Sequence, residues 1–595
     1  MAAAAAAGPA AAQGAQDAAL TKLLDADYEA LLQMDPDALT RLGRKEHYGE
    51  LTDRSDAGVD ARLKRRRASV AAMRKAFDPK ALGEDARTSF EMWALELERA
   101  ERQRRWAGHS YVFDRNGAHT RLPNFLINFH RVTEVSDMDA YVARLAAAGP
   151  ALDEQIGRAQ RAAAAGVRMP RFSYDQSLEE VRRITTGAPF TGGPDSALFA
   201  DAKGKIGALR ARGKIDDAKA AAYEKAVVGA MTERVKPAYD RLAAWLAADR
   251  DRTSPEPRGA GALPDGAAYY DAMLADQTTT AMTADEIHKL GLSEVKRLRA
   301  EMEALKGRIG FAGSLGEFFA YMRTEPRFYL PATDAGRAEY LRLAQGYLDG
   351  MKAKLPEVFP RLPRAALAAR RVEAFREEPG GAAHYSSGAP DGSRPGVFYV
   401  HLADMTATPT FELEGTAYHE GWPGHHMQIS LAQEMRGAQE MKGLPVFRTQ
   451  AGYGAYVEGW GLYSELLAKE MGFYQDPYSD FGRLGREIWR GIRLVVDTGI
   501  HAKGWSEAQA LDYYTSNSPQ PAAKIRSEIR RYFTTPGQAT SYKVGMVRIL
   551  ALRARAKAAL GPRFDIKGFH EAVLGAGSLP LSVLDARVER WMKRA

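Results

Sequence analysis

The sequence predicts a mainly α-helical protein of many helices with one small β-sheet. Over residues 17–250, Ala, Leu, Arg, Glu and Lys dominate, and apolar residues recur at three- and four-residue spacing, as on one face of a helix. Helix-compatible sequence resumes at Ala267, and Thr283 with Glu286 forms a capping-box pattern ahead of another apolar run. These features favour helices along most of the chain.

Two short stretches are the candidates for strands. Residues 396–402 are rich in Val, Phe and Tyr and follow a turn-rich stretch, which is typical of a strand. Residues 370–375 are a weaker candidate. The stronger strand precedes the histidine-rich segment discussed below, and we expect it to lie at the edge of a small sheet, where an extended peptide can pair with it.

The chain length predicts more than one lobe. With 595 residues, the protein exceeds the size at which a single core usually keeps growing. Residues 1–16 are almost entirely Ala, Gly, Pro and Gln, and we expect either a disordered tail or the remnant of an export signal. Residues 17–250 then form an N-terminal helical lobe, residues 251–266 a linker rich in Pro and Gly, and residues 267–595 a second lobe.

Composition excludes several classes of site and partner. The absence of cysteine rules out a thiol nucleophile, an iron–sulfur cluster and a cysteine-liganded zinc site. The formal net charge is +8, yet the densest basic run, residues 64–67, lacks an accompanying aromatic motif, so we predict a solvated helix face and no nucleic-acid partner. No stretch is apolar enough for membrane insertion.

Residues 418–428, Tyr-His-Glu-Gly-Trp-Pro-Gly-His-His-Met-Gln, indicate a metal site. In the common HExxH pattern two histidines four residues apart bind zinc from one helix face, and the intervening Glu is the general base. His419 and Glu420 fit that pattern, but the second histidine position holds Pro423. The next histidines are His425 and His426, and neither meets His419 on a regular helix.

Pro423 and Gly424 offer a way around this mismatch. Proline removes a backbone donor and clashes with the preceding turn, and glycine allows a sharp bend. We therefore expect a broken helix that returns one of the two histidines to the metal. The spacing alone leaves both His425 and His426 open as the second ligand.

A second segment, Tyr456-Val-Glu-Gly-Trp-Gly-Leu-Tyr-Ser-Glu, supplies carboxylates on a helix. Zinc hydrolases with two histidine ligands commonly take a Glu from a later helix, so Glu458 is the predicted third ligand. Glu465, seven residues further on, lies on a similar face and is predicted to orient a ligand.

These two segments resemble the DUF885 family, whose pattern is HExxPGHxxQ followed by EGWxxY. The chain carries His419, Glu420, Pro423, Gly424, His425 and Gln428 of the first pattern, and Glu458, Gly459, Trp460 and Tyr463 of the second. The resemblance runs from about residue 20 to the end. It implies a zincin-like, gluzincin-type fold with the small sheet beside the metal helix, and it favours His425 because the residue after Gly-His varies in the family.

A polar stripe on an otherwise apolar helix is predicted over residues 482–502. It is formed by Arg486, Arg490, Arg493, Asp497 and His501, which fall on one helix face. We predict a buried network in which Asp497 or His501 supports the metal ligands and an arginine such as Arg493 binds a substrate carboxylate. A purely structural salt-bridge network is the alternative.

Three residues are candidate hydrogen-bond donors to an oxyanion: Tyr542, His501 and Tyr463. Core packing is the alternative for both tyrosines, and we favour it for Tyr463. His426 is expected to be a packed or hydrogen-bonded histidine near the site.

The sequence thus predicts a zinc-dependent metallopeptidase that hydrolyses short peptides, of the carboxypeptidase or dipeptidase type. One Zn²⁺ ion is held by His419, His425 and Glu458, and Glu420 activates water. One alternative is a zinc amidohydrolase acting on a non-standard amide or isopeptide bond of a small molecule, and another is a non-catalytic binding protein. We expect a periplasmic or secreted protein, with the cytoplasm as the alternative, and leave the oligomeric state open.

Overall fold

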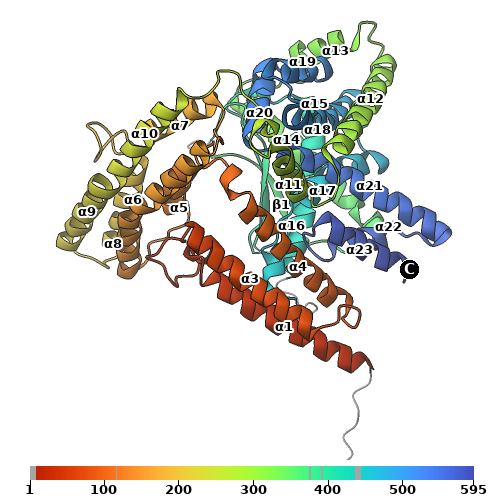
Figure 1. The fold of residues 1–595 in the computed structure, drawn as a ribbon. Coiled ribbons are helices and arrows are strands. Elements are labelled where there is room, and N and C mark those ends of the chain that lie inside the picture. Colours follow the sequence, from red (N-terminus) through yellow and green to blue (C-terminus); the bar gives the residue numbers. More distant parts are fainter. Residues whose placement is uncertain (1–8, 116, 374–376, 390–392, 436–443) are drawn as a thin grey trace, which may run out of the picture. The chain divides into compact units, whose positions relative to one another are not determined.

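The computed structural model describes residues 9–115, 117–373, 377–389, 393–435 and 444–595, and helices dominate it (Figure 1). Within these residues there is one small sheet. The prediction of a mainly α-helical chain with a small sheet is confirmed.

Ten helices precede residue 251. They are α1 (Pro9–Leu32), α2 (Pro36–Arg41), α3 (Asp56–Ala76), α4 (Glu84–Arg105), α5 (Ala118–Asn128), α6 (Val135–Ala164), α7 (Arg171–Ile184), α8 (Ala197–Ala211), α9 (Asp217–Ala230) and α10 (Lys236–Arg250). The later helices are α11 (Gly266–Thr278), α12 (Ala284–Ile309), α13 (Leu315–Thr324), α14 (Asp334–Lys354), α15 (Thr410–Glu420), α16 (His425–Glu434), α17 (Gly454–Glu470), α18 (Pro477–Lys503), α19 (Glu507–Asn517), α20 (Ala522–Thr534), α21 (Ser541–Leu560), α22 (Ile566–Leu574) and α23 (Leu581–Met592).

The chain divides into two compact units. Residues 22–76 and 94–269 form the N-terminal unit, and residues 1–21, 77–93 and 270–595 form the C-terminal unit. The segment 77–93 joins the C-terminal unit although it lies early in the sequence. Arg590 of α23 explains part of this arrangement, because it forms ion pairs with two glutamates at the start of α4.

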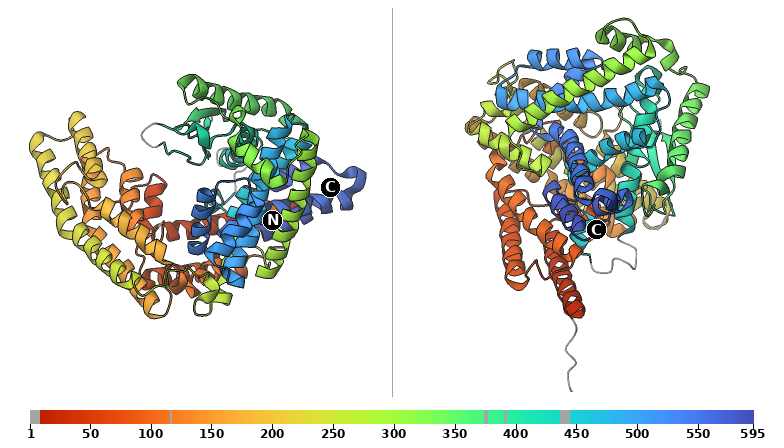
Figure 2. Two further views of the ribbon diagram at one scale, coloured as in Figure 1. Left: turned by 90° about the horizontal axis from the view of Figure 1, so that it is seen from above. Right: turned by 90° about the vertical axis from the view of Figure 1, so that its right-hand side faces the viewer.

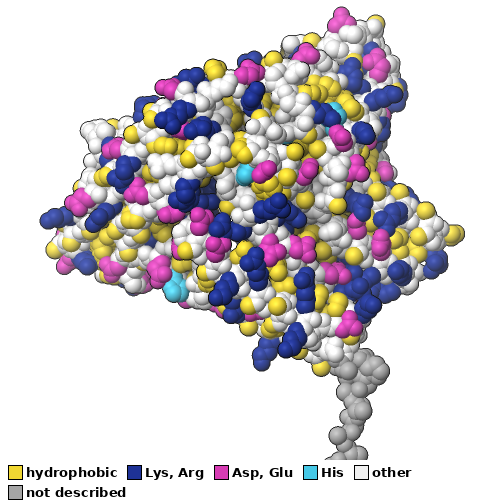
Figure 3. Space-filling view, viewed as in Figure 1, with side chains coloured by type: hydrophobic (Ala, Val, Ile, Leu, Met, Phe, Trp, Pro, Cys, Tyr) yellow, Lys and Arg dark blue, Asp and Glu magenta, His cyan; other side chains and the backbone are white. Residues whose placement is uncertain are grey.

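The N-terminal unit has its own core, formed by apolar side chains of α5 to α10. The basic run 64–67 lies on α3, where Arg65 pairs with Asp27 and Arg67 pairs with Glu101. On the face shown in Figure 3, basic and acidic side chains are interspersed. The run is therefore part of a solvated, ion-paired helix face.

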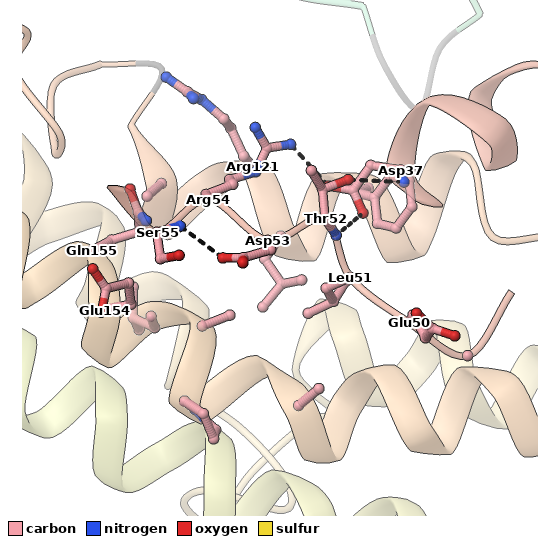
Figure 4. Close-up of a pocket in the computed structure, with 18 of the residues that line it drawn as sticks. Asp37, Glu50, Leu51, Thr52, Asp53, Arg54, Ser55, Arg121, Glu154 and Gln155 are labelled. Atoms are coloured by element: carbon pink, nitrogen blue, oxygen red, sulfur yellow. Dashed lines mark hydrogen bonds and ion pairs between the residues drawn. The ribbon is translucent and has the colours of Figure 1, made fainter. Parts of the chain in front are cut away.

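The N-terminal unit also encloses a cavity of about 610 Å³ (Figure 4). Its apolar lining includes Phe125, Leu152 and Tyr239. At the rim, Asp37 accepts hydrogen bonds from the backbone of Thr52 and from Arg54. The charges at this part of the rim are therefore engaged with one another.

In the C-terminal unit, α18 is a central helix that packs against α12, α15 and α19 (Figures 1 and 2). Glycine allows its close approach to α15, because a Cβ atom on Gly482 would lie 2.0 Å from the carbonyl oxygen of Phe411. The pairing of α17 with α21 uses the same device, since a Cβ atom on Gly545 would lie 1.8 Å from the carbonyl oxygen of Ala455. These contacts set the positions of α15, α17 and α18, which carry the candidate site.

The sheet contains β1 (Leu367–Arg371), β2 (His384–Ser386) and β3 (Gly396–Val400) in the order β1-β3-β2. β3 pairs with β1 in parallel and with β2 in antiparallel orientation. The strand predicted over 396–402 is confirmed, and β1 covers the start of the weaker candidate 370–375, whose residues 374 and 375 lie outside the described part. The prediction that residues 396–402 form an edge strand is wrong, because neighbouring strands occupy both edges of β3.

None of the helices in the described part of the chain has both the length and the apolar character needed to cross a lipid bilayer.

Candidate metal centre

The helix break predicted at Pro423 and Gly424 is present. α15 ends at Glu420 and α16 begins at His425, with a turn between them. Gly424 is required there, since a Cβ atom would lie 1.9 Å from the carbonyl oxygen of His419. Trp460 of α17 fastens the turn by donating its indole N–H to the carbonyl oxygen of Pro423 at 2.9 Å.

The break brings two histidines and a glutamate together. The Nε2 atoms of His419 and His425 lie 3.5 and 3.8 Å from the same Oε2 atom of Glu458. Donor atoms about 2.0–2.2 Å from one tetrahedral zinc ion are roughly 3.3–3.5 Å apart. The imidazole and carboxylate groups are ligand types that suit zinc, and the two distances to Glu458 are close to this separation.

Glu420 lies in the same group. One ligand atom from each of His419, Glu420 and His425 falls within 4.8 Å of the others. His419 and His425 are buried, whereas the Glu458 side chain is 26% exposed and Glu420 is half-buried. The histidines thus form the closed side of the site and the carboxylates face its open side.

Gly461 makes room for the ring of His419. A Cβ atom at this position would lie 2.6 Å from Cε1 and 2.8 Å from Nε2 of His419. Gly461 is three residues after Glu458 on α17, so the helix that supplies the third ligand also leaves space for the first one.

The buried ion pair of Glu465 with Arg486 fixes the ring of His419 through its Nδ1 atom. Nδ1 of His419 donates to Oε1 of Glu465 at 2.8 Å. Arg486 of α18 donates to both oxygens of Glu465, at 3.1 and 3.2 Å, and also to Thr416 at 2.8 Å. This chain of hydrogen bonds leaves Nε2 of His419 directed at Glu458, and it matches the predicted role of Glu465.

The electrostatics of the group favour cation binding. Burial alone would lower the pKa of His419, but hydrogen bonds to Glu458 and Glu465 outweigh it and raise the pKa to about 9. Burial likewise opposes ionisation of both glutamates, yet His419 and His425 bring the pKa of Glu458 down to about 2, and Arg486 and His419 do the same for Glu465. Both carboxylates are therefore charged at neutral pH.

His425 differs from His419 in its protonation. Its pKa is lowered by burial and by the nearby charge of His419, so it is a neutral imidazole at neutral pH. Neutral imidazole is the form that binds a metal. Because His419 carries a proton in the metal-free protein, metal binding is expected to release it.

His426 is not available as a ligand. Its Nδ1 lies 3.0 Å from the Tyr385 hydroxyl, and its Nε2 lies 3.1 Å from the carbonyl oxygen of Ala365. Its ring also packs edge-on against Trp422. Of the two histidines that the spacing left open, the structure thus places His425 beside His419 and Glu458, whereas His426 links α16 to the sheet region.

The polar stripe on α18 is buried as predicted, but its residues have separate partners. Asp497 accepts hydrogen bonds from Tyr270 and the backbone of Gly537, and His501 contacts the carbonyl oxygen of Tyr532. At about 1.5 Å per residue, they lie roughly 16 and 22 Å along the helix from Arg486. The predicted support of the metal ligands by Asp497 or His501, and the oxyanion role of His501, are therefore corrected, because a shared helix face does not bring distant turns together.

Arg493 and Tyr542 lie against each other. The Arg493 guanidinium is 4.6 Å from the centre of the Tyr542 ring and donates to Glu528 at 2.9 Å. Tyr542 is half-buried, so it keeps the exposure that a substrate-binding donor requires.

Tyr463 has a structural role. Its hydroxyl group lies 2.8 Å from His570 and accepts a hydrogen bond from Arg553. It is fully buried on α17, which supports the packing alternative. The oxyanion role considered for Tyr463 is corrected accordingly.

Sequence reasoning placed Arg486 in the stripe without connecting it to the metal ligands, and it did not identify Gly461. The contact of Arg486 with Glu465 joins α18 to α17, and no spacing along the chain indicates it. The one feature of the sequence that could have pointed to this contact is the excess of arginine on an otherwise apolar helix.

Comparison with known proteins identifies the family of the chain. The family described as "Bacterial protein of unknown function (DUF885)" matches residues 36–588. The chain belongs to the DUF885 family. No curated protein matches the chain.

Two solved structures resemble this DUF885 chain along nearly its full length. One is described as "the putative lipoprotein from Colwellia psychrerythraea", with 27% identity, a TM-score of 0.83 and coverage of 97% of this chain and 99% of that chain. The other is "a putative lipoprotein of unknown function from Shewanella oneidensis", with 18% identity, a TM-score of 0.74 and coverage of 98% and 99%. The second shows a shared fold alone.

Proposed function

We propose that the chain is a zinc-dependent metallopeptidase that hydrolyses amide bonds of short peptides. The observation that carries this proposal is the convergence of Nε2 of His419 and His425 on one oxygen of Glu458 at 3.5 and 3.8 Å. A His₂Glu ligand set leaves a fourth position open, which is typical of catalytic zinc and not of structural zinc. The same arrangement, with two histidines around a helix break and a glutamate on a later helix, supports a zincin-like, gluzincin-type site.

The residues around the metal have distinct roles in this mechanism. Zinc, when bound, supplies Lewis-acid polarisation of the scissile carbonyl and of a water molecule. Glu420 takes a proton from the attacking water and then delivers it to the nitrogen of the leaving amine. Glu465 and Arg486 keep the ring of His419 in place through the contact at Nδ1. Tyr542 is the remaining candidate donor to the oxyanion.

For the location of the chain we propose the periplasm or the exterior of the cell. The relative from Colwellia psychrerythraea, at 27% identity, is described as a putative lipoprotein, which supports this proposal. Peptides in that compartment are the substrates we propose.

The first prediction concerns Glu420. The purified protein should bind one zinc ion, and the Glu420→Gln variant should bind zinc equally while losing roughly 10²–10⁴-fold of the peptidase activity, because only the proton-transferring group is removed. Metal analysis by mass spectrometry and cleavage of a mixed peptide library measure the two quantities.

Two outcomes would contradict the proposal. Full activity in Glu420→Gln would refute the assignment of the base. A zinc-loaded wild-type protein that leaves every peptide intact but cleaves small non-peptide amides would instead favour the amidohydrolase alternative.

A further inference from the structure

Arg490 is a charged group that the fold leaves uncompensated. Among the described residues, it donates one hydrogen bond, from Nη1 to the carbonyl oxygen of Arg486 at 3.1 Å, and its buried Nε has no partner. The arginines on either side differ, since Arg486 pairs with Glu465 and Arg493 pairs with Glu528. Arg490 is half-buried, so its guanidinium stays within reach of a ligand, and an anion is expected to supply the missing partner.

Arg490 lies near the metal ligands. Its Nη1 donates to the carbonyl oxygen of Arg486, and Arg486 in turn pairs with Glu465, which holds Nδ1 of His419. On its other side, its guanidinium is 6.0 Å from the centre of the Tyr542 ring, which Arg493 also contacts. Arg490 therefore belongs to the surroundings of the candidate metal centre, on the side where Tyr542 retains some exposure.

The ion pairs around Arg490 leave positive charge in excess. Glu465 pairs with Arg486, and Glu528 is shared by Arg493 and Arg531. The carboxylate of Glu458 is directed at the histidines. Arg490 therefore has no carboxylate of its own among these ion pairs, and a bound anion would supply one.

Further donors are available beside Arg490. Nε and Nη1 of Arg493 are buried without a partner among the described residues. Two guanidinium groups with free N–H donors suit a planar carboxylate, which each of them can bind in a bidentate manner.

We propose that Arg490, assisted by Arg493, binds the free α-carboxylate of a peptide substrate and makes the enzyme a carboxypeptidase. This inference rests on the proposed metallopeptidase function and names its substrate class. Peptides with a free carboxyl terminus are substrates, and peptides with a blocked carboxyl terminus are not.

The test compares acetylated peptides that differ only at the carboxyl terminus, one with a free acid and one with an amide. Wild-type enzyme should cleave the acid about 100-fold faster in kcat/KM, because a charge-assisted hydrogen bond is lost in the amide. In Arg490→Met the ratio should fall to about 3 or less. Arg490→Lys keeps the charge without the planar fork, and its ratio should be intermediate.

Thermal stability separates this role from a structural one. Arg490→Met should keep or raise the Tm, because no internal ion pair is broken. Arg486→Met should lower the Tm, because it leaves Glu465 buried without its partner. A large fall in Tm for Arg490→Met would overturn the assignment.

Direct binding provides a readout independent of turnover. The Glu420→Gln protein should bind the acid peptide about 100-fold more tightly than the amide in calorimetry, and Glu420→Gln/Arg490→Met should bind the two alike. Equal binding of both peptides to Glu420→Gln, or equal cleavage of both by the wild type, overturns the proposal. A wild-type protein that cleaves nothing yet shows this binding preference would refute the peptidase function and leave carboxylate recognition intact.

Discussion

The geometry of single residues decides the chemistry of the candidate centre. His419 has both ring nitrogens committed, Nδ1 to Glu465 and Nε2 toward Glu458. His426, next to a presumed ligand in sequence, has both nitrogens committed elsewhere. Whether a histidine can bind a metal thus depends less on its place in the sequence than on the partner of each of its ring nitrogens.

Substitution of Gly461 is predicted to disturb the ring of His419. In Gly461→Ala the new Cβ would lie 2.6 Å from Cε1 of His419, so the ring must move. Zinc affinity should fall about 10- to 100-fold, as it does when the orientation of a ligand is disturbed. Competition with a chromophoric chelator measures this affinity.

Gly454→Ala is the matched control for that measurement. Gly454 is in the same helix, and a Cβ atom there would approach Ser541 only to 3.8 Å. This variant should bind zinc normally. Wild-type zinc affinity in Gly461→Ala would show that the ring of His419 does not depend on this space.

At the scale of elements, the site depends on how closely α15, α17 and α18 approach one another. The first ligand and the base lie at the end of α15, the third ligand lies on α17, and Arg486 reaches from α18 to both. Glycines at the crossings fix these separations, and larger residues would push the helices apart. The metal ligands therefore depend on backbone contacts that lie away from the metal.

Gly482 and Gly485 give a matched pair of substitutions on α18. Gly482→Ala should destabilise the protein by about 1–3 kcal/mol, because its Cβ would lie 2.0 Å from the backbone of α15. Gly485→Ala should be neutral or stabilising by up to about 1 kcal/mol, since its Cβ meets Pro519 at an ordinary 3.5 Å and alanine favours the helix. Chemical denaturation measures both values, and equal effects of the two substitutions would contradict the proposed role of the crossing.

At the scale of the whole molecule, buried ionisable groups couple the fold to pH. In the C-terminal unit, burial lowers the pKa of His426 and His501 to about 4 and that of His570 to about 3. In the unfolded chain each of these histidines takes up a proton near pH 6.5. Below that pH the unfolded state binds more protons than the folded state, so stability falls as pH decreases from about 6.5 toward 4.

His501→Gln tests this coupling at a site far from the metal. The loss in free energy of unfolding between pH 7 and pH 4.5 should be smaller in the variant by on the order of 2 kcal/mol, because one such histidine is gone. Denaturant titrations at the two pH values measure it. An unchanged dependence in His501→Gln would refute the account.

The division into units also belongs to this scale. The sequence predicts a boundary near residues 251–266 from its Pro and Gly content, and the C-terminal unit begins close by, at residue 270. Its inclusion of residues 77–93 follows from packing and ion pairs such as those of Arg590 with α4, which no local composition indicates.

The sequence by itself determined the features that depend on local chemistry. Apolar spacing determined the helices, Pro423 and Gly424 determined the break after α15, and residue types and spacing indicated His419, Glu420 and Glu458 but left His425 and His426 both open. These features follow from residues close together in the chain, where backbone sterics and helix geometry apply directly.

Only the tertiary structure decided which of these groups meet. It separated His425 from His426, joined Arg486 to Glu465, placed β3 in the centre of the sheet, and left Arg490 without a carboxylate. It also placed Asp497 and His501 with partners on other turns and helices. The reason is physical, because a side chain's partner depends on distances between helices, and those distances are set by packing of segments far apart in the sequence.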